Sequence, residues 1–193
     1  MSVSVGDREL PVGVGAAAGV AAWVLSYLCT YLVASGDIQN SLFGRVLEAA
    51  EIGVWQAVGW VFFNAHFVNT VVDLGFFGGG ATNAIGGENG FTPLLYVVPP
   101  LLLLVAGLAV GRYVGASDLD TADAALSGVT VVLGYGLLSV VGVFLFATEN
   151  VTPDLVTGVL LAGVVYPVVF GAVGAVVASL TGGSSAESSS PQL

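Results

Sequence analysis

Four long runs of apolar residues limit the folds that are open to this chain. They cover about residues 12–34, 94–114, 122–147 and 155–180, and the charges within them lie at their ends, as Asp123 does in the third run. A helix of about 20 apolar residues crosses the roughly 30 Å of hydrocarbon in a bilayer. Lipid cannot satisfy backbone hydrogen bonds, so these runs predict transmembrane helices.

The composition supports a location in the cell membrane. Of 193 residues, 56% are hydrophobic and 8% are charged, whereas a soluble domain has about 25% charged residues. We therefore predict an all-α, polytopic helical bundle over residues 12–181. A polar segment (1–11) precedes it, a glycine-rich flexible loop (75–92) interrupts it, and a disordered polar tail (182–193) follows it.

A fifth apolar stretch contains polar residues at helical spacing. Seven residues of this stretch share one narrow stripe of a helix: Glu48, Glu51, Trp55, Phe62, His66, Asn69 and Asp73. This stripe favours a fifth span over about residues 50–73, with its polar seam turned inward. The alternative is four spans and one helix at the membrane interface. Gln56 and Asn64 fall off the stripe and argue against the span.

The three arginines leave the topology open between these alternatives. Five spans with the N-terminus outside place Arg45 and Arg112 in the cytoplasm, and four spans with the N-terminus inside place Arg8 and Arg112 there. The positive-inside rule scores both alike. Both predict a cytoplasmic C-terminus.

The inventory of reactive side chains argues against an enzyme. The chain has no lysine, one histidine and one cysteine, which excludes a Schiff base and a zinc tetrad. We therefore expect no catalytic residue, no cofactor and no metal site. The net charge of −10 also argues against nucleic acid as a partner.

The polar seam is the candidate functional site. In one interpretation, His66 and Asn69 line a hydrated path, and Glu48, Glu51 and Asp73 lie at its mouths. In the other, the polar residues hold neighbouring helices together by hydrogen bonds.

Prolines and small residues suggest how the predicted helices bend and pack. Pro99, Pro100 and Pro167 fall within predicted spans, where proline removes a backbone donor and kinks a helix. The small-residue spacing at Gly107 and Gly111 lets helices approach closely.

The acidic, lysine-free composition, with the stretch "FGRVLEAAEIGVWQAVGWVFFNAHFV" and the glycine-rich loop after it, resembles a family of small multi-spanning membrane proteins of halophilic archaea. The function of that family is unknown, so the resemblance implies no catalytic residues.

Two functions follow as hypotheses. The first is a small ion or solute transporter or channel-like protein that uses the seam. The alternative is a non-catalytic structural or accessory subunit of a membrane protein assembly. In both cases we expect the partners to be the lipid bilayer and either further copies of the chain or another membrane protein.

Overall fold

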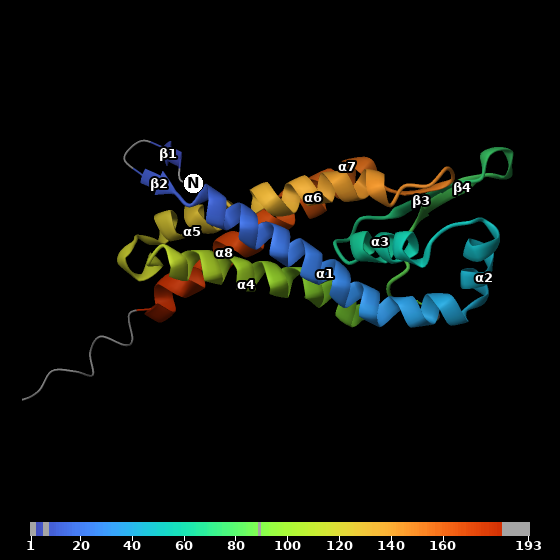
Figure 1. Cartoon of the computed structure of the whole chain (residues 1–193), viewed down its shortest axis with the longest axis horizontal. Coiled ribbons are helices and arrows are strands. Elements are labelled where there is room, and N and C mark those ends of the chain that lie inside the picture. The colour runs from blue at the N-terminus through green and yellow to red at the C-terminus, as the bar shows by residue number, and fades with distance from the viewer. Residues whose placement is uncertain (1–2, 6–7, 89, 183–193) are drawn as a thin grey trace, which may run out of the picture.

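The computed structural model describes residues 3–5, 8–88 and 90–182. Most of the described chain is helical and forms an elongated bundle, with a small sheet at one end (Figure 1). Four helical stretches are long and apolar enough to cross a membrane: Val12–Asn40, Pro93–Tyr113, Thr121–Leu145 and Leu155–Gly182. The predicted helical membrane protein is thus supported, although the described chain also contains short strands.

The first of these stretches is helix α1 (Val12–Asn40). Its 29 residues extend for about 43 Å, which exceeds the roughly 30 Å of hydrocarbon. The sequence predicted an end near residue 34, and the extra turns carry polar groups such as Asp37 beyond the apolar part. Ser41 then begins the short helix α2 (Leu42–Ala49), because its hydroxyl accepts a hydrogen bond from the Gly44 N–H at 3.0 Å.

The other three stretches each join shorter helical elements. The second combines η2 (Pro93–Val97) with α4 (Val98–Tyr113), and the third combines α5 (Thr121–Val129) with α6 (Val132–Leu145). The fourth joins α7 (Leu155–Thr157), the π-helical η4 (Gly158–Val165) and α8 (Tyr166–Gly182). A short 3-10 turn, η3 (Ala116–Asp118), lies between the second and third stretches.

The predicted span over residues 50–73 is wrong, because the chain leaves the helical path twice within it. Helix α3 covers Val54–Asn64, and its 11 residues extend for about 16 Å, about half of the hydrocarbon thickness. In the first turn of α3, the Gln56 side chain accepts a hydrogen bond from the N–H of Gly53, the residue before the helix, at 3.0 Å. At the end of the helix, the Asn64 side chain donates to the Val68 carbonyl oxygen at 2.8 Å. Gln56 and Asn64, which lie off the polar stripe, therefore mark the start and the end of the helix.

Helix α3 does not lie flat on the bundle surface. Residues 57–64 are all buried, and α3 packs against α1 and against Phe146, the residue directly after the third stretch. The number of membrane-length helices matches the four-span alternative, but the fifth segment is inserted into the end of the bundle.

A three-stranded antiparallel sheet extends the same end. It consists of β3 (Thr70–Asp73), β4 (Gly79–Thr82) and β5 (Val151–Pro153) in the order β4-β3-β5. In the register, Val71 lies opposite Ala81 and Thr152. The segment 75–92, expected to be a flexible loop, thus contains β4 and the short 3-10 turn η1 (Gly75–Phe77). A separate hairpin of β1 (Val3–Val5) and β2 (Arg8–Leu10) precedes α1 at the opposite end (Figure 1).

Glycines bring the long helices into backbone contact. A Cβ atom at Gly107 of α4 would overlap the Gly171 carbonyl oxygen of α8, and one at Gly128 of α5 would overlap the same oxygen. A Cβ at Gly111 would press against Ala175 of α8. The packing role predicted for Gly107 and Gly111 is confirmed.

Replacing Gly107 with alanine should destabilise the bundle. The added methyl group would force α4 and α8 apart, and overpacking of this kind costs about 1–3 kcal/mol. Gly36→Ala is the matched control, because a Cβ there meets no described atom within 4 Å and alanine stabilises a helix by about 0.5–1 kcal/mol relative to glycine. Thermal unfolding in detergent, followed by circular dichroism, measures both. Equal melting temperatures for the two variants would contradict the close contact.

The four-span arrangement also predicts that both chain ends lie on one side of the membrane. The β1–β2 hairpin and the end of α8 lie at the same end of the bundle (Figure 1). Single cysteines introduced at Ser2 and Ser189, in a chain with Cys29→Ala, should react with an impermeant thiol reagent from the same side. Reaction from opposite sides would indicate an odd number of spans. The cytoplasmic location of the C-terminus stays a prediction.

Candidate functional site

His66 is fully buried, just beyond the end of α3, and both of its ring nitrogens have partners. Nδ1 lies 2.8 Å from the Phe62 carbonyl oxygen, and Nε2 lies 2.7 Å from the Tyr135 hydroxyl oxygen of α6. A carbonyl group can only accept, so Nδ1 carries the proton and donates it. These distances fit neutral His66, in which Nε2 is the acceptor and the Tyr135 hydroxyl donates to it.

Burial also favours neutral His66. His66 lies outside the four membrane-length helices, and its burial lowers its pKa from 6.5 to about 4, against a smaller opposing effect of the hydrogen bond to Phe62. The charged imidazolium loses hydration in this position, and the described structure offers no carboxylate at the ring nitrogens in return.

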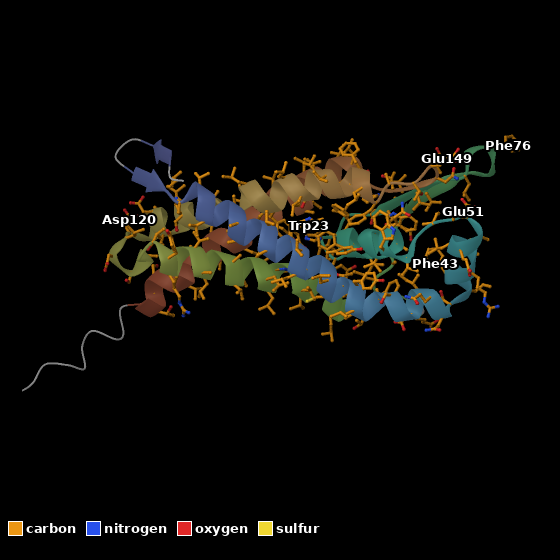
Figure 2. All side chains as sticks on the ribbon, viewed as in Figure 1. Trp23, Phe43, Glu51, Phe76, Asp120 and Glu149 are labelled. Atoms are coloured by element: carbon orange, nitrogen blue, oxygen red, sulfur yellow. The ribbon has the colours of Figure 1, made fainter. Side chains whose placement is uncertain are left out.

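Two further buried polar side chains lie on α1, and one of them lies close to Tyr135. Ser26 neighbours the Tyr135 hydroxyl, but its own hydroxyl makes no hydrogen bond of standard geometry within the described residues. The same holds for Nε1 of the buried Trp23, whose side chain lies within the bundle (Figure 2). We call Trp23, Ser26, His66 and Tyr135 the core polar cluster.

Aromatic rings surround the core polar cluster. Phe62 makes edge contacts with Trp23 and His66, at ring-centroid distances of 5.0 and 4.8 Å. Phe146 stacks on Tyr27 at 5.3 Å, and its carbonyl oxygen accepts a hydrogen bond from the Trp60 indole N–H at 2.7 Å. His66 therefore contacts rings and hydrogen-bond partners, and has no access to solvent.

The structure does not bring the other residues of the predicted seam to His66. Glu48, Glu51, Asn69 and Asp73 are all exposed and lie on α2, on the connection between α2 and α3, in the segment before β3, and at the end of β3. The Asp73 carboxylate accepts a hydrogen bond from the Gly75 N–H at 2.8 Å. The continuous helical face is therefore wrong, although a path-lining role for these residues stays a prediction.

The three prolines lie within membrane-length stretches, as predicted, and each lies where one helical element gives way to the next. Pro99 and Pro100 lie in the first turn of α4, where the missing N–H breaks no helical hydrogen bond. Pro167 lies in the first turn of α8, directly after the π-helical segment. The carbonyl of Ala162, five residues earlier, loses a backbone donor there and accepts a hydrogen bond from the Ser139 hydroxyl at 3.4 Å. Pro167 thus marks a change of helix type, and a kink at this position stays a prediction.

Asn64 is a central polar residue that was not among the predicted site residues. It is fully buried. Its amide nitrogen donates to the Val68 carbonyl and to the Thr70 hydroxyl at 3.1 Å, and its side-chain oxygen accepts from the Ala84 N–H at 2.9 Å. Asn64 thereby ties the end of α3 to the sheet and to the glycine-rich segment. Its position off the polar stripe was the available signal.

The sheet end of the molecule carries several carboxylates, including Glu51 and Glu149 (Figure 2). No group of three or more His, Cys, Asp or Glu residues in the described ranges could hold a metal ion. Asp154 has a structural role instead. Its carboxylate accepts hydrogen bonds from the backbone N–H and the hydroxyl of Thr157 at 2.8 and 2.7 Å, which lowers its pKa.

The buried, neutral His66 should make folding sensitive to mild acid. Below pH 6.5 the unfolded chain takes up a proton at His66, whereas the folded chain does so only near pH 4, so stability falls as the pH falls through this interval. The difference corresponds to roughly 3 kcal/mol at most. We expect the melting temperature in detergent to fall more between pH 7 and pH 4.5 for the intact chain than for His66→Gln. Equal losses would show that His66 titrates normally in the folded state.

Comparison with known proteins places the chain in a family without assigning an activity. No curated protein and no solved structure matches the chain significantly. The haloarchaeal origin suggested by the composition stays a prediction. A family model described as a family of unknown function, DUF7978, matches residues 2–182. This match covers nearly the whole chain, which therefore belongs to the DUF7978 family.

Proposed function

We propose that this chain is a non-catalytic accessory subunit of a membrane protein assembly and that it binds a protein partner with its sheet end. The proposal corresponds to the second of the two functions predicted from the sequence. The observation that carries it is the exposed apolar tip of the β3–β4 hairpin.

The hairpin tip projects beyond the bundle and exposes large apolar side chains. Phe76 is 100% exposed and Leu74 is 54% exposed, and Phe76 lies at the far end of the molecule (Figure 2). Burying such a side chain in an interface contributes roughly 1.5–3 kcal/mol. These side chains are not needed to cross a bilayer, because the stretches of membrane-spanning length lie elsewhere in the chain.

The tip is held in a defined shape, which favours specific binding. The Leu74 N–H donates to the Gly78 carbonyl oxygen at 2.8 Å, and the Asp73 carboxylate accepts from the Gly75 N–H at 2.8 Å. Beside the tip, β4 is an edge strand of the sheet, and an edge strand presents backbone groups to which another strand can pair. A preorganised tip loses little conformational entropy on binding.

The geometry gives less support to transport. A path would have to include His66, but the hydrogen bonds of His66 end at the Phe62 carbonyl and at Tyr135, inside a ring of aromatic side chains. The proposed mouth residues lie on the outer surface of the sheet end. These contacts favour a packing role for the core polar cluster.

Photo-crosslinking tests the proposal. A photoreactive amino acid replaces Phe76 in one variant, and Leu119 in a control at the opposite end, where the leucine is 38% exposed. After irradiation of membranes from the native host, the Phe76 variant should form a discrete adduct, and the Leu119 variant should not. Mass analysis of the adduct then distinguishes a second copy of the chain from a different protein.

The proposal fails if the Phe76 variant crosslinks only to lipid or gives the same adducts as the control. Transport would replace it if the purified chain in proteoliposomes carried an ion or solute flux above background and His66→Ala abolished this flux without loss of folded protein.

A further inference from the structure

A cleft of about 710 Å³ lies between the end of α1, the start of α2 and the segment that follows β4. Its volume falls within the range of about 300–1,000 Å³ that is typical of small-molecule sites. The cleft is separate from both the core polar cluster and the hairpin tip, so it is independent of the function proposed above.

The walls of the cleft are braced by internal hydrogen bonds. The Asn83 side-chain oxygen accepts from the Ile85 N–H at 2.9 Å and from the Tyr96 hydroxyl at 3.3 Å. The Gly86 N–H donates to the Phe91 carbonyl oxygen at 2.8 Å, and the Phe91 N–H donates to the Ala84 carbonyl oxygen at 2.8 Å. The residues on this side are therefore fixed, and the Asn83 side chain is already occupied.

The remaining surface combines one negative charge with apolar groups. Asp37 is the charged residue among those that line the cleft, and its carboxylate has no hydrogen bond or ion pair within the described residues. The rings of Phe43 and Phe91 and the side chain of Ile38 supply the apolar lining. Phe43 is half-exposed, at 50%, so its ring is available to a ligand.

One carboxylate beside apolar side chains favours some classes of ligand over others. A divalent cation such as Ca²⁺ takes about six to eight oxygen ligands, and the cleft offers a single carboxylate. An anion would be repelled by Asp37. A cation with apolar substituents satisfies both features, because the carboxylate neutralises its charge and aromatic rings attract it through cation–π interaction.

We propose that the cleft binds a small organic cation of the quaternary ammonium class, with Asp37 as the counter-ion and Phe43 and Phe91 as the aromatic walls. The same group occurs in free solutes and in lipid headgroups. The cleft would make the same contacts with the quaternary ammonium group from either source.

The probe is tetramethylammonium, and the neutral comparison is 2,2-dimethylpropan-1-ol, which has a similar shape without the charge. Binding to the purified full chain in nonionic detergent is measured by saturation-transfer NMR on the methyl protons of the probe. We expect saturable binding of tetramethylammonium and at least about tenfold weaker binding of the neutral alcohol.

Three variants test the assignment of residues. Asp37→Asn should weaken tetramethylammonium binding by about tenfold, and Phe43→Leu should weaken it by about threefold. The matched control is Glu48→Gln, which removes an exposed carboxylate on α2 that does not line the cleft and should leave the affinity unchanged. Circular dichroism verifies that each variant is folded.

A second arm identifies the source of the cation. Loss of tetramethylammonium binding in phosphocholine nanodiscs, but not in phosphoglycerol nanodiscs, assigns the site to a lipid headgroup, and equal binding in both assigns it to a soluble cation. Either result supports the site. The proposal is overturned if binding is not saturable, if the neutral alcohol binds equally well, or if folded Asp37→Asn keeps the affinity of the intact chain.

Discussion

The close approach of helix backbones at glycine is the constraint on which the rest of this structure depends. Lipid is as apolar as the helix surfaces, so the hydrophobic effect does not press membrane helices together, and van der Waals packing must do so. The contacts of Gly107 and Gly128 with Gly171 hold α4, α5 and α8 side by side. Gly19 of α1 similarly approaches the backbone of Tyr135 in α6 and of Val131 directly before it. These contacts align the long helices and leave room at one end of the bundle for the short helix α3.

The insertion of α3 explains why the most polar buried residues have a structural role. Asn64 and His66 lie at the end of a helix that stops within the bundle, where several backbone groups would otherwise lack partners. The Asn64 side chain forms hydrogen bonds with the Val68 carbonyl and the Ala84 N–H. The His66 ring forms hydrogen bonds with the Phe62 carbonyl and the Tyr135 hydroxyl. Polar side chains that satisfy the end of a buried helix look the same in sequence as polar side chains that line a path.

The sheet end contains both surfaces on which function is proposed, and they use different chemistry. The hairpin tip exposes Leu74 and Phe76 for a protein partner. The cleft is lined by Asp37, Phe43 and Phe91, and the ligand proposed for it is a small organic cation. Both surfaces depend on Asn64, which connects the end of α3 to the sheet and to the segment that lines the cleft. Segments distant in sequence, from α1 to β5, thus form one unit.

The sequence by itself determined the features that depend on local composition. The long apolar runs predict the four membrane-length helices, because length and hydropathy suffice to specify a span, and glycine spacing predicts close packing. The tertiary structure decided what residues 48–73 become. Their stripe at helical spacing is compatible with a span, but the Gln56 side chain caps the start of α3 at Gly53, and the Asn64 side chain bonds to the Val68 carbonyl beyond its end. It also decided which partners each polar side chain meets, since Tyr135 lies 69 residues from His66 and periodicity carries no information over such a separation.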